Sequence, residues 1–346
     1  MQDLKKLFAK RKDKRNELPT DDRCVVPAHI EGSKKEIGQL AHLINEMCKS
    51  PAGRDVIETA LKNDFTFVFD TSEPDAYGYA DPENKICAMN PNFNEADLIT
   101  TMAHELRHVH QFESPITEQC NPYEADSKSN LMLSKIMEAD AEGYGCLVSW
   151  ELKEQGSPAA WNTFARDFPE IAKPFKKAME QNAGKADQVE KARTAAFYGW
   201  FDNTPRRVGY DDSHVDFLKQ IGRKNISKNL KSFAVEDMMA QITCEHGKNY
   251  FTDDFKAIDT DKYVAVAEST KDDLNFFFNY QNKGSRDPSV DKMPVMKSRR
   301  AAPAAKSNEA KAAALAAKQE RAAAQIRSIR AKPALMMAAK MKNMGR

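Results

Sequence analysis

The sequence of 346 residues lacks any apolar stretch that approaches the roughly 20 residues needed to cross a bilayer. Its N-terminus, which begins Met1-Gln-Asp-Leu-Lys-Lys, is basic and lacks the apolar region of a secretory signal. These absences exclude an integral membrane protein. We expect a cytoplasmic protein, with export that needs no cleaved signal as the alternative.

Cysteines are few, and none of them form a Cys-x-x-Cys pair. The six are scattered over the chain: Cys24, Cys48, Cys87, Cys120, Cys146 and Cys244. A chain of this length can bury a large core without disulfide bonds, so we expect reduced thiols. A zinc site built from cysteines is not expected.

Net charge is also nearly absent, at +1, but the charges are unevenly distributed. Residues 297–346 carry 13 basic and two acidic side chains, and residues 1–15 carry seven basic and two acidic ones. The part between them, 16–296, therefore has a net charge of −15. Segregated charge of this kind is typical of tails that contact a partner.

Three regions follow from this pattern. Residues 1–30 form a basic, loosely ordered arm, residues 31–285 the folded domain, and residues 286–346 a basic tail rich in Ala, Lys and Arg. The tail is predicted to be helical or disordered. Its partner would be an anionic surface, which leaves nucleic acid, a membrane and an acidic protein as candidates.

The folded region begins and ends with helices and has few strands. Ser33 and Glu36 form a capping-box pattern, and Pro51 suits the first turn of a second helix. Tyr77–Ala80 and Lys85–Met89 flank a four-residue turn, which predicts a β-hairpin. Helical periodicity follows at about 95–112 and 128–154. We therefore expect an α+β fold that is mostly α, with a small antiparallel sheet.

A His-Glu-x-x-His motif lies in the first of these two long helices. His104 and His108 are one helical turn apart, so their imidazoles can converge on one metal ion, and imidazole is a preferred zinc ligand. Glu105 is rotated about 100° from them and can act instead as the base that accepts a proton from a water at the metal. His110 would point to the opposite side of the helix from His108.

A catalytic zinc ion normally has three protein ligands, so one more ligand is needed. The second long helix carries Glu138, Asp140 and Glu142 among apolar residues. Buried carboxylates are costly without a partner, and a metal ion with its histidines would be one. Each of the three is a candidate, and a solvated acidic face of the helix is the alternative.

The residues of these two helices are similar to those of a known group of proteins. His104-Glu-x-x-His108 followed by Glu138-x-x-Ala-Glu142 resembles the gluzincin zinc metallopeptidases. More narrowly, residues 103–111 together with 137–142 are similar to a bacterial family of metallopeptidase domains of unknown function. The resemblance spans about residues 60–150 and implies a zincin-like domain with Zn²⁺ as cofactor.

The resemblance also implies roles for single residues. A Glu on the downstream helix is the third ligand, which we take to be Glu138. An acidic residue four positions later orients a ligand histidine, and Glu142 stands there although many gluzincins have Asp. Asp140 and Glu142 remain alternative ligands or hydrogen-bond partners of an imidazole. The edge strand of the hairpin would bind an extended peptide by strand addition.

The predicted function is hydrolysis of peptide bonds in a protein or peptide substrate, with Zn²⁺ bound by His104, His108 and Glu138 and with Glu105 as general base. Hydrolysis also needs a donor to the developing oxyanion, and Tyr144, Tyr198, Tyr210, His214 and His246 qualify by residue type only. The competing function is that of a non-catalytic, metal-stabilised binding protein that acts through its basic tails. Hydrolysis of a non-peptide amide at the same site is a third possibility.

Overall fold

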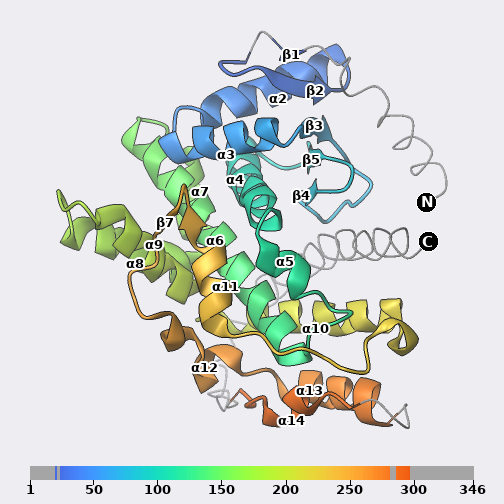
Figure 1. The fold of residues 1–346 in the computed structure, drawn as a ribbon. Helices are drawn as coiled ribbons and strands as arrows, with labels where there is room; N and C mark the ends of the chain where they lie inside the picture. Colours follow the sequence, from blue (N-terminus) through green and yellow to red (C-terminus); the bar gives the residue numbers. More distant parts are fainter. Residues whose placement is uncertain (1–19, 22–23, 281–285, 297–346) are drawn as a thin grey trace, which may run out of the picture. The chain divides into compact units, whose positions relative to one another are not determined.

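Helices predominate in the computed structural model, which describes residues 20–21, 24–280 and 286–296. The expected α+β class with mostly helical content is therefore confirmed (Figure 1). Most of the expected basic arm and most of the basic tail lie outside the described residues. In the part of the chain that is described, no helix is both long and apolar enough to cross a membrane.

The chain divides into two compact units. The first consists of Met1–His110 and Tyr144–Asp167, and the second of Gln111–Gly143 and Phe168–Arg346. Two long helices contribute residues to both units, because the divisions fall inside α4 (Glu95–Phe112) and α6 (Ser127–Glu154). Both helices lie within two residues of their predicted bounds.

A five-stranded sheet lies in the first unit, in the order β1-β2-β3-β5-β4. Its strands are β1 (Thr20–Asp21), β2 (Ala28–Glu31), β3 (Thr66–Phe69), β4 (Gly78–Asp81) and β5 (Ile86–Met89). The predicted hairpin is confirmed, since β4 pairs antiparallel with β5 and forms an edge of the sheet.

The expectation of an antiparallel sheet was wrong. The sheet is mixed, because β2, β3 and β5 run parallel to one another. Parallel neighbours need a crossover, and α2 (Lys34–Met47) and α3 (Pro51–Lys62) form it between β2 and β3. Residues 28–30, which belonged to the expected loose arm, lie in strand β2 of this sheet.

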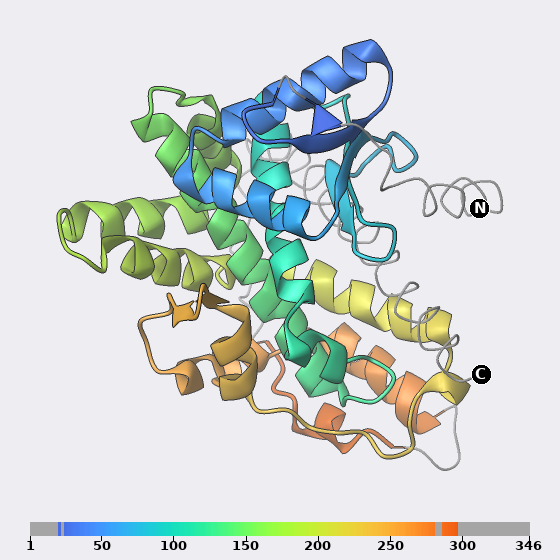
Figure 2. The same ribbon diagram turned by 45° about the horizontal axis from the view of Figure 1, so that its top comes forward.

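Helices α2 and α3 begin as their sequences predict. Ser33 and Glu36 form the capping box of α2, and Pro51 occupies the first turn of α3. The two helices pack against each other, and α2 also packs against β2 and β3 (Figures 1 and 2). The first unit ends with α7 (Ala159–Asp167).

The second unit is almost entirely helical. Its larger helices are α8 (Pro169–Gln181), α9 (Gln188–Trp200), α10 (Thr204–Ile221), α11 (Val235–Ile242) and α13 (Glu268–Asn275). Short elements complete it: α5 (Pro115–Gln119), η2 (Arg223–Asn225), β6 (Cys244–Glu245), β7 (Lys248–Asn249), η3 (Phe255–Ile258), α12 (Asp261–Val264), η4 (Phe276–Tyr280) and α14 (Pro288–Lys292).

The core of this unit includes an apolar cluster in which residues far apart in sequence meet. Its buried members are Leu131, Val215, Phe217, Leu218, Ile221, Ile226, Val266, Leu274, Phe277, Phe278, Val290 and Met293. The cluster joins α6 and α10 to the segment 251–296, so this segment is an integral part of the second unit.

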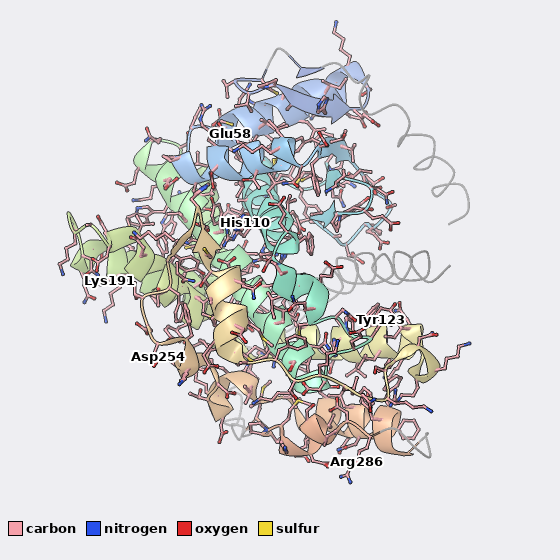
Figure 3. The ribbon with its side chains drawn as sticks, viewed as in Figure 1. Glu58, His110, Tyr123, Lys191, Asp254 and Arg286 are labelled. Carbon is pink, nitrogen blue, oxygen red and sulfur yellow. The ribbon has the colours of Figure 1, made fainter. Side chains whose placement is uncertain are left out.

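Helices α8 and α9 form a closely packed hairpin, on which Lys191 is labelled in Figure 3. A Cβ atom at Gly199 would collide with the carbonyl oxygen of Glu170 and lie 3.1 Å from the Cα of Ile171. We expect Gly199→Ala to lower the free energy of unfolding by about 1–3 kcal/mol, because the backbone of α8 has to move away. Urea unfolding of the full chain measures this change.

Gly143→Ala is the matched control, since it makes the same substitution inside helix α6. Its Cβ would lie 3.7 Å from Ala196 Cβ, an ordinary contact. Alanine also favours the helix over glycine by about 1 kcal/mol, so this variant is expected to be at least as stable as the parent. Equal losses at both positions would show that close helix packing is not the cause.

All six cysteines lie in the described part of the chain, and none of them forms a disulfide bond there. Cys48, Cys87, Cys120 and Cys146 are buried, and burial raises the pKa of the Cys120 thiol to about 12.

Candidate metal centre

Helix α4 holds the His-Glu-x-x-His motif with its apolar face in the core. Leu98, Met102, Leu106 and Val109 recur at helical spacing and are buried. The Nε2 atoms of His104 and His108 lie 3.0 Å apart, and the rings meet edge to face. Both side chains are more than nine-tenths buried. The two imidazole nitrogens therefore converge on one point, as ligation of a single ion requires.

Glu105 contacts the edge strand of the sheet. Its carboxylate oxygen Oε2 accepts a hydrogen bond of 3.1 Å from the backbone N–H of Ala80 in β4. Since β4 pairs with β5 on its other side, this N–H lies on the outer side of the edge strand. The backbone of β4 thus holds the carboxylate in place.

Close packing around β4 depends on a glycine. A Cβ atom at Gly78 would lie 2.6 Å from the carbonyl oxygen of Ala88 and 3.1 Å from Thr101 Cγ2. Only a residue without a side chain fits this space. Gly78 therefore allows β4 to pack tightly beside β5, while the contact with Thr101 of α4 sets a weaker limit.

Glu138 is held on α6 by a tyrosine of α10. Its side chain is 5% exposed, and its Oε2 accepts a hydrogen bond of 2.6 Å from the hydroxyl of Tyr210. One turn earlier on α6, the ammonium of Lys135 lies 3.0 Å from the carboxylate of Asp211, and both side chains are almost fully buried. These two contacts fix the rotation of α6 against α10.

The two histidines and Glu138 form a group that could hold a metal ion. One nitrogen from each imidazole and one oxygen of Glu138 all lie within 4.8 Å of one another. Two imidazoles and a carboxylate are a usual donor set for zinc, so the residues present fit the ion. Within the described residues, no second group of three such side chains comes together in this way.

Asp140 is fully buried and faces a different set of partners. Its carboxylate accepts hydrogen bonds from Gln111 Nε2 at 2.7 Å and from the Tyr250 hydroxyl at 2.8 Å. The guanidinium of Arg193 lies 3.4 Å away, stacks on the Tyr250 ring and pairs with Glu245. Asp140 therefore joins three elements of the second unit.

Burial of Arg193 would lower its pKa, but the negative charges of Glu245 and Asp140 outweigh this effect. The pKa of Arg193 therefore lies above its ordinary value, and the guanidinium stays charged. Glu142, one turn after Glu138, is half-buried.

Sequence reasoning missed most of the residues that hold the candidate ligands. Gln111 follows His108 by three positions and donates to both Asp140 and the carbonyl oxygen of Met137. Its helical spacing was a signal that could have been used. Arg193 and Tyr250 are far from the motif in sequence and carry no such signal. Tyr210 was one of the five residues considered, by residue type, as donors to the oxyanion, and not as a partner of Glu138.

Comparison with known proteins agrees with this geometry. Residues 14–250 match the model of a family described as the Putative metallopeptidase family (DUF6782). The chain belongs to this family. The match includes the motif of α4, the acidic residues of α6, and Tyr210 on α10. Neither curated proteins nor solved structures give a match.

Family membership and the donor group together support a metal site and a peptidase activity. The match ends at Tyr250, whereas the described part of the second unit continues to Met296. This chain therefore has a packed segment, residues 251–296, beyond the part that matches the family.

Proposed function

We propose that the chain is a zinc-dependent peptidase in which His104, His108 and Glu138 hold the ion and Glu105 is the general base. The observation that carries the proposal is the convergence of two imidazole nitrogens and one carboxylate oxygen within 4.8 Å. All three side chains are buried, and carboxylates and imidazoles are rarely gathered in a protein interior without a charge to bind.

A zinc ion held there would polarise a peptide carbonyl and lower the pKa of a water molecule. Glu105 accepts a proton from the attacking water and delivers it to the nitrogen of the departing amine. The Ala80 N–H keeps one oxygen of this carboxylate oriented while it carries the proton. Asp140 holds the end of α4 to α6 through Gln111, which keeps Glu138 at a fixed height along its helix.

The substrate would bind as an extended strand along β4. The backbone groups of Gly78 and Ala80 face away from β5, as the hydrogen bond from Ala80 to Glu105 indicates. Strand addition at this edge would use the main-chain groups beside the Ala80 N–H, which already donates to Glu105, and would place a peptide next to Glu105. Preference for particular side chains would then depend on the surroundings of the edge rather than on the pairing itself.

Tyr210 is expected to act as a positioning residue for Glu138. We expect Tyr210→Phe to weaken zinc affinity by about 10–100-fold, because the hydrogen bond that orients the carboxylate is lost while the ring still packs. Competition of the folded variant with a zinc chelator measures this affinity. Tyr198→Phe, the same substitution at a half-buried tyrosine of the same unit, is the control and should bind zinc like the parent.

Zinc content tests the metal site directly. The full chain, purified without added metal, should contain about one zinc ion per molecule by atomic emission. His104→Ala should contain none, whereas His110→Ala, two positions further along the same helix, should keep the ion. A metal-free parent protein would rule out the zinc site. Zinc binding without cleavage of any peptide would favour the non-catalytic binding protein instead.

A further inference from the structure

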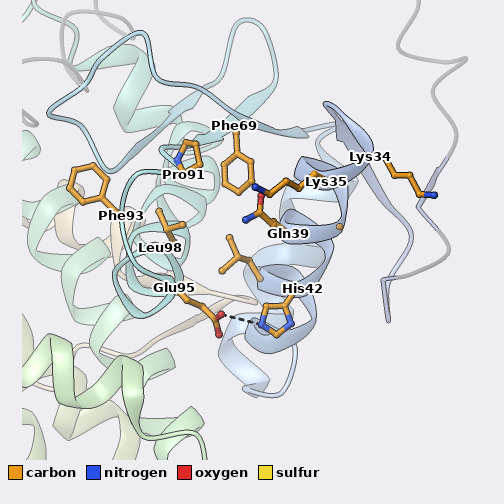
Figure 4. A pocket seen from close by; sticks show the side chains of 11 residues that line it. Lys34, Lys35, Gln39, His42, Phe69, Pro91, Phe93, Glu95 and Leu98 are labelled. Carbon is orange, nitrogen blue, oxygen red and sulfur yellow. Dashed lines mark hydrogen bonds and ion pairs between the residues drawn. The ribbon is translucent and has the colours of Figure 1, made fainter.

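A cavity of about 440 Å³ lies beside the first turns of α2 and α4 (Figure 4). It is found at the carboxyl ends of parallel strands, because Phe69 is the last residue of β3 and Pro91 follows the end of β5. Ligands of sheets with parallel strands commonly bind outside this edge. The volume is within the range of small-molecule sites.

Apolar side chains form the floor of the cavity. Leu43 and Leu98 are buried, while the rings of Phe69 and Phe93 are half-buried at its sides. The ring of Phe93 is fixed by stacking on Tyr77 with centroids 3.8 Å apart. An apolar group of modest size can therefore be removed from water here without rearrangement of the walls.

Polar side chains lie at the rim of the cavity, and its two ends carry different groups. The side chain of Lys35 runs across the mouth towards Gln39, whereas Lys34 points away (Figure 4). His42 and Glu95 pair at 3.2 Å at the other end. The N-terminal turn of α2 adds its partial positive charge beside Lys35. One end of the cavity is thus cationic, and the other offers both a donor and an acceptor.

We propose that this cavity binds the carboxy-terminal end of a peptide whose last side chain is apolar. Lys35 binds the terminal carboxylate, Gln39 the preceding peptide group, and the floor formed by Leu43 and Leu98 the side chain. The His42–Glu95 pair binds the next peptide group along. Basic segments such as residues 297–346 do not fit, because their charge has the same sign as that of Lys35.

The cavity is separate from the candidate metal centre. Leu98 precedes His104 by six positions, which corresponds to about 9 Å along α4. The proposal rests on the proposed function only for the source of such peptides. Its test measures binding without turnover, so that a failure of the peptidase activity leaves the result unchanged.

The probe is N-acetyl-Ala-Leu, titrated into the full chain and followed by the backbone amide signals of α2. We expect saturable binding with a Kd on the order of 1 mM, since the probe is small. The corresponding amide, N-acetyl-Ala-Leu-NH₂, should bind at least about 10-fold more weakly, because it lacks the carboxylate. Equal binding of acid and amide would overturn the proposal, as would binding of octanoate in preference to the peptide acid.

Two variants locate the site. Lys35→Glu keeps the helix, because an acidic residue suits its first turn, and should weaken acid binding at least about 10-fold. Gln39→Trp fills the mouth and should abolish binding. Lys177→Glu, an exposed lysine of α8, makes the same change in net charge and should bind like the parent. Undiminished binding by both Lys35→Glu and Gln39→Trp would show that the peptide binds elsewhere.

Discussion

Replacement of Glu105 by Gln is expected to lower kcat for peptide hydrolysis by about 10²–10⁴-fold while zinc stays bound. The amide has nearly the shape of the carboxylate, and its oxygen can still accept the hydrogen bond from Ala80 N–H. It cannot take up a proton from water, so only the chemical step is removed. Cleavage of casein and zinc content, measured on the same samples, give both quantities.

Glu113→Gln is the control for this experiment. Glu113 is exposed and follows the end of α4, so the same substitution there should leave both cleavage and zinc content unchanged. Full activity of Glu105→Gln would mean that another group is the base. Loss of zinc together with activity would instead indicate that Glu105 helps to bind the ion.

A chain that ends at Tyr250, where the family match ends, is expected not to fold its second unit. Deletion of 251–296 removes six members of the buried apolar cluster: Val266, Leu274, Phe277, Phe278, Val290 and Met293. Each contributes about 1.5–3 kcal/mol on burial, so the loss is on the order of 10 kcal/mol. That is comparable to the whole stability of a typical domain.

Polar contacts add to this loss. The buried carboxylate of Asp287 accepts a hydrogen bond of 2.8 Å from the backbone N–H of Ser127 at the start of α6. The backbone N–H of Lys128 likewise donates to the hydroxyl of Ser289 at 3.2 Å. Without these contacts, the first turn of α6 loses two of its hydrogen-bond partners. The helix that carries Glu138 would then be frayed at that end.

Thermal unfolding followed by circular dichroism measures the effect of this truncation. A chain that ends at Met296 retains every contact described above and is the control, expected to melt like the full chain. Cooperative melting of the 1–250 chain near the parent temperature would show that segment 251–296 is dispensable.

The sequence correctly predicted the features that depend on residues close together along the chain. The caps of α2 and α3, the hairpin of β4 and β5, and the extents of α4 and α6 depend on residues only a few positions apart. Periodicity and capping chemistry determine such features almost alone. The spacing of His104 and His108 is of the same kind, because a helix fixes their separation.

The parallel pairing of β2 with β3 could not be predicted in this way. The two strands are separated by α2 and α3, and their register depends on how the whole crossover packs. The partners of Asp140 and Glu138 were missed for the same reason. Arg193, Tyr210 and Tyr250 reach them from elements that the sequence separates by 50 residues or more.

The hydrogen bond from Ala80 to Glu105 determines which substitutions position 80 can accept. The donor is a main-chain N–H, so every residue except proline supplies it. A complete substitution scan would therefore show tolerance of small residues, which fit the buried position, and intolerance of proline. A comparison of relatives would show only that small residues occur at position 80, although the group that matters there is the main-chain N–H.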